Sequence, residues 1–148
     1  MDTDGRIAVV GSRRITEGVA EVLDALGIRP DVIVSGGAVG VDQQAAAWAR
    51  SRGVPIVEHL PDYKAHGRHA PHVRNRRIVD DCDVLVTIWL GDDGAPWPPN
   101  AEAMRHRARR RGVPVIGIRE VPSKTNPLRV AVTERLRVRA ALMQRRTA

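Results

Sequence analysis

The stretch Asp31-Val-Ile-Val-Ser-Gly-Gly-Ala-Val-Gly-Val-Asp42 contains the parts of a βα unit in order. Residues 31–35 form a short run rich in β-branched side chains, which is typical of a buried strand. Two adjacent glycines and Gly40 follow, where a tight turn needs backbone freedom. The Ala-rich run 41–52 then predicts a helix that Gly53 ends. This order predicts an α/β fold.

The same alternation continues on both sides of this stretch. Four more apolar runs have the composition of strands: 6–10, 54–58, 83–89 and 113–118. Further helices are expected at 17–26, with Thr16 as cap, near 74–80 and at 100–111. Strands that alternate with helices pair in parallel, and continuous Val/Ile runs are covered on both faces. We therefore expect a single Rossmann-like open parallel sheet of about five strands with helices on both faces.

Two nearly identical phrases mark passages from helix to strand. Arg52-Gly-Val-Pro-Ile-Val57 and Arg111-Gly-Val-Pro-Val-Ile116 each combine a helix end, a capping glycine, a proline and a strand. They predict two similar joints rather than an internal repeat. The sequence shows no linker, so we expect a sheet domain over residues 1–122. Residues 123–148 are expected to form a helical tail that packs on the same domain, with docking on a partner as the alternative.

Composition excludes several classes of protein. Hydrophobic residues make up 43% of the 148, which excludes a disordered chain, and the absence of Phe leaves the core to Val, Ile, Leu and Ala. The single cysteine, Cys82, excludes an internal disulfide, and flanking aspartates favour a buried thiol over a nucleophile. No apolar run could span a bilayer, and the polar start does not resemble a secretory signal. We expect no membrane association and a cytoplasmic location.

The formal net charge is +7, from 24 Lys and Arg against 17 Asp and Glu. Much of the excess falls in the Arg-rich stretches 105–111 and 129–146. Arg-rich helices are often only solvated faces. Charge alone therefore makes nucleic acid a less expected partner than a small molecule.

Loops that follow strands are the first places to look for a site, because ligands of open parallel sheets bind outside the carboxyl ends of the strands. After the first strand, Gly11 allows a sharp turn, and Ser12 and Arg13 can bind an anion. After the second, the glycine-rich turn brings backbone N–H groups and a helix start close to a ligand. Its residues are Ser35, Gly36, Gly37 and Gly40. The spacing matches neither a Walker A loop nor the dinucleotide-binding glycine pattern.

Asp42 closes this turn, and its residue type leaves two interpretations open. It can cap the following helix. Alternatively, its carboxylate can bind a sugar hydroxyl or the first loop.

The polar segment 61–77 contains His66, His69 and His72, whose spacing of three invites a metal interpretation. No cysteine accompanies them, and an intervening glycine and proline argue against one regular helix, so solvent-facing or ligand-facing histidines are favoured. We expect neither a metal nor a cofactor. Arg74 and Asn75 are better candidates, since arginine can clamp a phosphate and asparagine can recognise a base or ribose edge.

Two residues of the last loop have open interpretations. Trp97 can stack on a base or cover the edge of the core. Glu102 lies near a helix start, where a carboxylate is favourably placed.

The motifs Val9-Val-Gly-Ser-Arg13, Val34 to Asp42, Pro61 to Lys64 and Arg74-Asn-Arg76 resemble, in this order, the SLOG superfamily and above all its YspA-like family. More distantly, the chain is similar to the DNA-processing protein Smf/DprA and to the LONELY GUY phosphoribohydrolases. The resemblance covers residues 6–118.

The resemblance implies a Rossmann-like sheet that binds a nucleotide-derived ligand and allows a homodimer. The first loop would line the phosphate end, the glycine-rich turn with Asp42 would form the central cradle, and Arg74 with Asn75 would close over the ligand. In the hydrolases a Pro-Gly-Gly-x-Gly-Thr-x-x-Glu motif follows the fourth strand. Here Gly94-Ala-Pro-Trp-Pro-Pro-Asn-Ala-Glu102 keeps the glutamate but lacks the paired glycines and the Gly-Thr step.

Three hypotheses follow. The first is a binding protein, a sensor or carrier, for a phosphate-bearing nucleotide or nucleotide-derived ligand. The second is a nucleoside-monophosphate phosphoribohydrolase-like enzyme in which Glu102 and Arg74 are catalytic. The third is a DprA-like DNA-binding module that uses its Arg-rich face.

Overall fold

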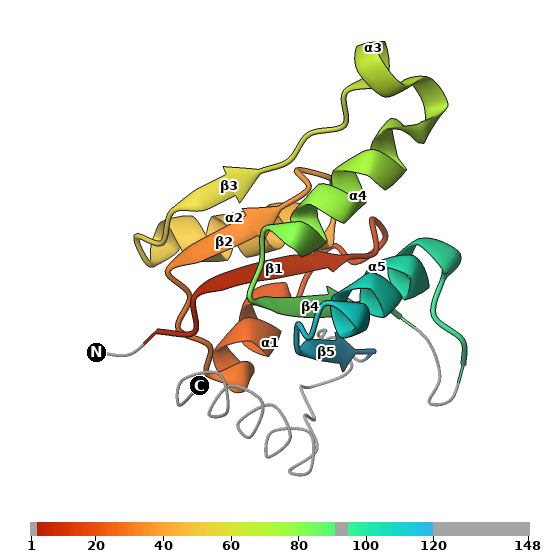
Figure 1. Ribbon diagram of the computed structural model, residues 1–148. Helices are drawn as coiled ribbons and strands as arrows, with labels where there is room; N and C mark the ends of the chain where they lie inside the picture. Colours follow the sequence, from red (N-terminus) through yellow and green to blue (C-terminus); the bar gives the residue numbers. More distant parts are fainter. Residues whose placement is uncertain (1–2, 91–94, 120–148) are drawn as a thin grey trace.

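The computed structural model describes residues 3–90 and 95–119. Within these ranges all strand pairs are parallel, in the order β3-β2-β1-β4-β5 (Figure 1). The strands are β1 (Arg6–Gly11), β2 (Val32–Ser35), β3 (Ile56–Glu58), β4 (Val84–Ile88) and β5 (Val115–Ile118). The open Rossmann-like sheet predicted from the sequence is confirmed.

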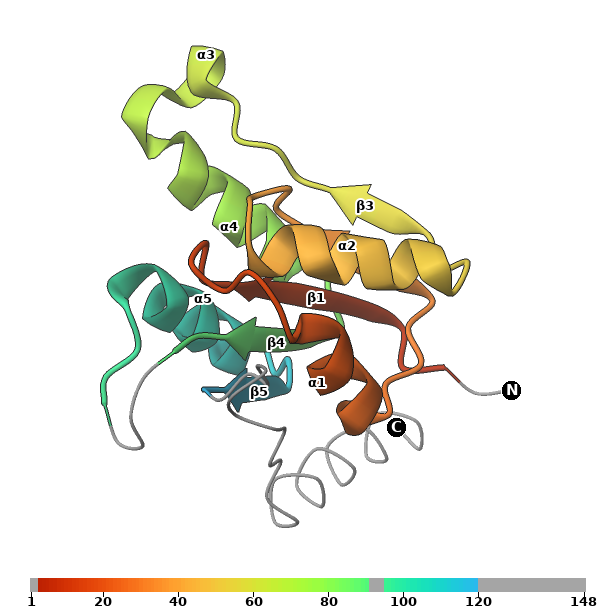
Figure 2. The ribbon, with the colours of Figure 1, turned by 180° about the vertical axis from the view of Figure 1, so that it is seen from behind.

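Helices cover both faces of this sheet. They are α1 (Val19–Leu26), α2 (Val41–Ser51), α3 (Tyr63–His66), α4 (Ala70–Asp80) and α5 (Pro99–Arg110), with a 3₁₀ turn, η1 (Gly67–His69), before α4. The helices α4 and α5 lie on the face seen in Figure 1, and α1 and α2 lie on the face seen in Figure 2. The short α3 and the η1 turn project beyond the sheet as an arm between β3 and α4.

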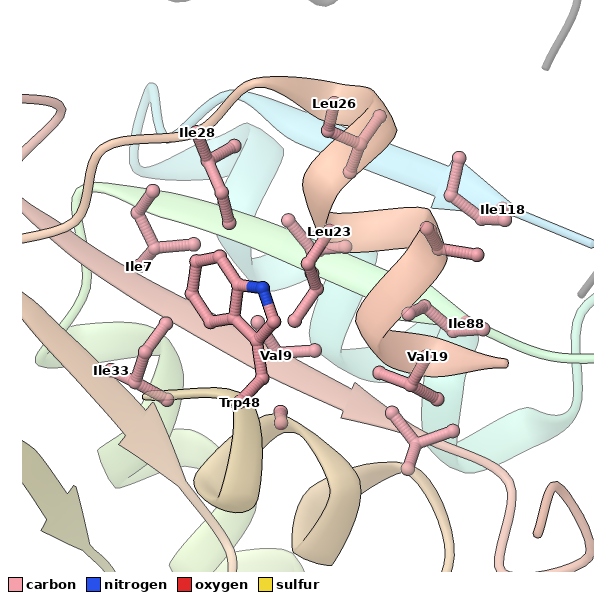
Figure 3. Packing of buried hydrophobic residues seen from close by; sticks show 14 of the residues in the cluster. Ile7, Val9, Val19, Leu23, Leu26, Ile28, Ile33, Trp48, Ile88 and Ile118 are labelled. Atoms are coloured by element: carbon pink, nitrogen blue, oxygen red, sulfur yellow. The ribbon is translucent and has the colours of Figure 1, made fainter. Parts of the chain in front are cut away.

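The core has two layers because successive side chains of a strand point to opposite faces. Ile7 and Val9 of β1 pack with α1 and α2, whereas Ala8 and Val10 pack with α4 and α5. In Figure 3, the ring of Trp48 lies among the aliphatic side chains of the first layer. Burial of each large aliphatic side chain contributes about 1.5–3 kcal/mol, so these layers hold the helices against the sheet.

The predicted N-cap of the first helix is wrong. Helix α1 begins at Val19, after Gly18, rather than after Thr16. The N–H of Val19 donates instead to the Gln44 side chain of α2 at 3.3 Å, and Gln44 also donates to the carbonyl of Ile15 at 2.7 Å. A side chain from a neighbouring helix therefore takes the place of a local cap.

Two more boundaries differ from the prediction. Helix α4 begins at Ala70 rather than near Arg74, with a proline in its first turn, where no N–H is needed. Strand β3 begins only at Ile56, because Pro55 has no N–H to donate, although its carbonyl accepts from Ile33 at 2.9 Å.

The two similar joints are confirmed. Val54 N–H donates to the carbonyl of Ala49 at 2.9 Å, and Val113 N–H donates to that of Ala108 at 2.8 Å. Each joint therefore closes its helix with the same backbone bond and leads directly into an edge strand.

Cys82 is buried, 8% exposed, beside the start of β4. Burial, and then the negative charges of nearby aspartates, raise the pKa of its thiol to about 12. The interpretation as an unreactive core residue is supported. No helix in the described part of the chain is long and apolar enough to cross a membrane. The predicted tail, 123–148, lies outside the described residues.

Candidate functional site

The direction of the connections changes between β1 and β4. From β1 the chain crosses through α1 to β2 on one face of the sheet, and from β4 it crosses through α5 to β5 on the other face. The loops that follow β1 and β4 therefore lead away from each other. Such a topological switch point is where open α/β sheets bind ligands.

The loops that follow β1 and β2 lie against each other. The carbonyl of Ser12 accepts the N–H of Val41, the first residue of α2, at 3.2 Å. A Cβ atom at Gly40 would lie 2.4 Å from that same Ser12 oxygen, and one at Gly11 would lie 2.1 Å from the carbonyl oxygen of Ile88. Only glycine permits this close approach of the two loops.

Asp42 holds the glycine-rich turn rather than capping α2. Its side chain is almost fully buried, and Oδ2 accepts the N–H of Ala38 at 3.3 Å. Burial raises the pKa of Asp42 to about 6. The Ala38 N–H, the charge of Arg74 and the N–H groups of Gly11 and Gly36 favour the ionised carboxylate and lower the pKa, but by less than burial raises it. The side chain therefore does not cap α2, and binding of a sugar hydroxyl by Asp42 stays a prediction.

Arg74 holds the same turn from the opposite face of the sheet. It is 9% exposed, and its Nη1 donates to the carbonyl of Gly36 at 2.6 Å, while Nε donates to the Asn75 side chain at 2.9 Å. A Cβ atom at Gly36 would lie 2.8 Å from Asp42 Oδ2 and 2.9 Å from Arg74 Nη1. Burial lowers the pKa of Arg74, and the charge of Asp42 opposes this. The carboxylate and the guanidinium therefore enclose one glycine.

The predicted site residues separate into two groups by exposure. The buried group is the framework of the loops: Ser35, Gly36, Asp42 and Arg74. Within it, Ser35 Oγ accepts the N–H of Gly37 at 3.1 Å and stabilises the turn. The accessible group can meet a ligand: Gly11, Ser12, Arg13, Gly37, Gly40 and Asn75.

Glu102 lies in the first turn of α5, with half of its side chain exposed. It forms ion pairs with Arg105 at 4.0 Å and Arg109 at 3.6 Å on its own helix. In the part of the chain that the structure describes, no hydrogen bond or ion pair joins Glu102 to Arg74. A catalytic role for this pair stays a prediction.

Trp97 covers the edge of the core. The guanidinium groups of Arg105 and Arg119 lie 4.1 and 4.2 Å from its ring centroid, and Trp89 meets it edge-on at 6.5 Å. A Cβ atom at Gly117 would lie 2.7 Å from the Trp97 ring. These contacts support the interpretation as a cover over β5 rather than as a stacking platform.

The three histidines of the polar segment lie in different elements, His66 in α3, His69 in η1 and His72 in the first turns of α4. Among residues 3–90 and 95–119, no three His, Cys, Asp or Glu side chains come together as a metal site.

Sequence reasoning missed one feature of this edge. Four large apolar side chains are exposed in the segments that follow β2, β3 and β4: Val39, Leu60 and Leu90 in loops, and Tyr63 at the start of α3.

The fold and the loops define an open α/β domain with a glycine-rich cradle at the carboxyl edge of its sheet. Residues 5–66 match the model of the family described as YspA, cpYpsA-related SLOG family. The predicted resemblance to the SLOG superfamily is thereby confirmed. The match spans both glycine loops and ends before Arg74.

One solved structure shows the same fold at low sequence identity. DNA processing protein A from Helicobacter pylori, studied for its single-stranded DNA binding mode, has a TM-score of 0.57 and 17% identity over 97% of this chain and 82% of its own. A predicted subunit of tRNA methyltransferase from Methanocaldococcus jannaschii has a TM-score of 0.43 and 14% identity over 93% and 74%. No curated protein matches the chain in sequence.

Proposed function

We propose that this protein binds a phosphate-bearing nucleotide or nucleotide-derived ligand at the carboxyl edge of its sheet, as a sensor or carrier. One observation carries the proposal. Arg74 and Asp42 come from opposite faces of the sheet and enclose Gly36, so that they hold the turn at the carboxyl edge from both sides. Burying two charged groups adds little to the stability of the folded protein. A loop that these groups hold in one conformation does favour ligand binding, because less ordering is needed when the ligand binds.

The phosphate end of the ligand would lie where the two loops meet. Helix α2 begins there, directly after Gly40, so the positive end of its dipole faces this point. A Cβ atom at Gly40 would lie 2.7 Å from the Cα of Arg13, which places an exposed cationic residue beside the helix start. Arginine and backbone N–H groups together make charge-assisted hydrogen bonds with phosphate oxygens.

A thermal-shift screen against nucleoside mono-, di- and triphosphates, ADP-ribose derivatives and cyclic nucleotides tests the proposal, with calorimetry on every hit. Arg13→Ala is expected to weaken binding at least about tenfold. Arg110→Ala, at the exposed end of α5, is the matched control and should leave affinity unchanged. If no nucleotide stabilises the protein, the proposal fails.

Chromatography of each mixture separates binding from turnover. A bound nucleotide that is recovered intact agrees with a sensor or carrier. A released base would instead support the hydrolase alternative, and Glu102→Gln should then abolish its release.

Single-stranded nucleic acid is a second candidate ligand, because a groove of about 350 Å³ with arginine and histidine side chains in its lining lies between α4 and α5. Its ionisable lining residues are all basic or histidine, and they include His72, Arg76 and Arg107. Val79 and Met104 lie beneath this groove, and both are buried. The Helicobacter pylori protein of similar fold is described for single-stranded DNA binding, which supports a test of this groove.

Fluorescence anisotropy with a labelled single-stranded oligonucleotide across a salt series provides that test. Binding should weaken steeply with salt, and Arg76→Glu should weaken it further at each concentration. Arg110→Glu carries the same charge change outside the groove lining and is the control. Binding that is absent or independent of salt would remove this candidate.

A further inference from the structure

A polar cavity of about 290 Å³ lies beside the glycine-rich turn, between α2 and the end of β3. It lies where α2 packs against β2 and β3 on one face of the sheet (Figure 2). Three of its residues form a stripe along α2, because positions three and four apart lie on the same side of a helix. The lining residues are Gly37, Asp42, Gln43, Ala46, Arg50 and Glu58. The cavity therefore adjoins the proposed phosphate site through the turn that both share.

Strand pairing places Glu58, the last residue of β3, beside this turn. It pairs in register with Ser35, the residue directly before the turn. A Cβ atom at Gly37 would lie 3.5 Å from Glu58 Oε2, so the carboxylate lies next to that glycine. The end of one strand therefore brings a carboxylate to the glycine-rich turn of its neighbour.

The exposed polar side chains of the cavity have hydrogen-bonding capacity that the protein does not use. Within residues 3–90 and 95–119, the side chains of Glu58, Gln43 and Arg50 form no hydrogen bond or ion pair. Asp42 differs, because its Oδ2 accepts the N–H of Ala38 and the residue is only 5% exposed. Glu58 is therefore the carboxylate of this cavity that is open to a ligand.

The three open side chains together favour a neutral ligand group with several hydroxyls. The carboxylate of Glu58 accepts hydrogen bonds, the guanidinium of Arg50 donates them, and the amide of Gln43 does both. A cationic group would meet the positive charge of Arg50, and an anionic group would meet the negative charge of Glu58. A hydroxyl group can donate to the carboxylate and accept from the guanidinium or the amide, so it suits all three.

The position of Glu58 also corresponds to a general feature of α/β sheets that bind ribose. In dinucleotide-binding sheets a glycine-rich turn holds the phosphates at a helix start, and an acidic residue about 20 positions further along accepts a hydrogen bond from a ribose hydroxyl. The glycine spacing differs here, but Glu58 ends the strand that follows α2. Gln43 lies in the first turn of α2, so the cavity begins about 5 Å from the helix start, a separation that a ribose ring can span.

We propose that Glu58 binds the ribose hydroxyl groups of the ligand, so that the site selects ribonucleotides over nucleotides that lack these hydroxyls. This inference rests on the proposed function. With the phosphate at the start of α2 beside Arg13, the sugar extends toward β3, and its 2′ and 3′ hydroxyls donate to the carboxylate. Gln43 and Arg50 donate to the same hydroxyl oxygens from α2.

Calorimetry with matched nucleotides tests the role of Glu58. The probes are AMP, GMP, CMP and UMP, and the 2′,3′-dideoxynucleoside 5′-monophosphates of the same four bases. The native protein should bind the best ribonucleotide at least about tenfold more tightly than its dideoxy counterpart, as expected for hydrogen bonds to a carboxylate. Glu58→Ala should bring this ratio close to one. The ratio is the quantity to compare, because loss of a negative charge near a phosphate raises the affinity for both probes alike.

Two further variants define the effect. Glu21→Ala is the matched control, because Glu21 is exposed in the first turn of α1 and lies outside the cavity lining, and it should leave the ratio unchanged. Glu58→Gln keeps an acceptor oxygen without the charge and should retain part of the preference.

Three results would overturn the assignment of Glu58 and leave the phosphate site standing. They are a ratio near one in the native protein, a ratio that survives Glu58→Ala, and loss of dideoxynucleotide binding in Glu58→Ala, since that probe has no hydroxyl for Glu58 to bind. If none of the nucleotides binds the native protein, the proposed function itself fails.

Discussion

Glycines serve different purposes at the two ends of this sheet. At the amino edge, Gly53 and Gly112 have φ angles of 68° and 72°, and a Cβ atom at either would meet nothing within 4 Å. At the carboxyl edge, Gly11 has no positive φ angle, but its Cβ atom would collide with the carbonyl of Ile88. Gly53 and Gly112 are therefore needed because their backbone conformation disfavours other residues, whereas Gly11 is needed because a side chain would not fit.

The difference separates folding from function. Gly53 and Gly112 end helices in the left-handed conformation, and a generic chain reversal needs no more than this. Gly40 combines a φ of 85° with a Cβ position 2.4 Å from Ser12 O, and it lies where the two loops meet. This close backbone packing therefore coincides with the proposed phosphate end, where a ligand needs close approach to N–H groups.

The largest expected effect tests the claim about space. Gly11→Ala should lower the free energy of unfolding by about 4 kcal/mol or prevent folding, because the new methyl group would lie 2.1 Å from Ile88 O and 2.6 Å from Val41 Cγ2. Urea unfolding followed by circular dichroism measures the change. A loss below about 1 kcal/mol would mean that β1 and β4 can separate at this edge without cost.

The electrostatic half of the comparison involves two aspartates. At the carboxyl edge, burial raises the pKa of Asp42 from 3.8 to about 6. At the amino edge, burial of Asp81 is outweighed by hydrogen bonds from Arg6 and His59, which lower the pKa of that carboxyl below its ordinary value. The two carboxylates should therefore influence stability with opposite signs.

Asp42→Asn sharpens this contrast. Between about pH 4 and pH 6 the folded protein holds the Asp42 proton more tightly than the unfolded chain does, so the free energy of unfolding falls as the pH rises through this range. The fall contributed by this one group is on the order of 3 kcal/mol and should be missing in Asp42→Asn. Urea midpoints at several pH values measure it.

Asp81→Asn is the control for this experiment. The stabilisation by Asp81 is present above its ordinary pKa and is lost as the pH falls, so its removal should flatten the acid side of the curve. Parallel curves for the native protein and Asp42→Asn would contradict the burial of an ionisable carboxyl under the turn.

The strands, the joints and the position of the loops could be predicted from the sequence, because short stretches of neighbouring residues determine them. The Val/Ile runs identified the strands, and the repeated Arg-Gly-Val-Pro phrases identified the joints at Gly53 and Gly112. Parallel topology then placed the loops at Gly11 and Gly36 on one edge, since all strands end there.

What escaped prediction depends on contacts between distant parts of the chain. Gln44 replaces the expected cap of α1 from 25 residues away, and Arg74 clamps Gly36 across 38 residues. Residue type does not reveal that Ser35 is buried while Arg13 is exposed, because burial follows from how the helices pack. The four-residue α3 is too short to produce a helical pattern, so the placement of Tyr63 was missed.

The smallest effect tests the claim about conformation. Gly112→Ala should lower the free energy of unfolding by only about 1 kcal/mol, because its Cβ atom meets no neighbour and only the left-handed φ of 72° is unfavourable. Gly112→Asn should cost less, since asparagine tolerates this conformation better than alanine does. Nucleotide affinity should be unchanged in both variants, because the joint lies at the edge opposite the cradle. A loss for Gly112→Ala as large as that for Gly11→Ala would show that the two ends of the sheet are equally constrained, and the distinction between space and conformation would be lost.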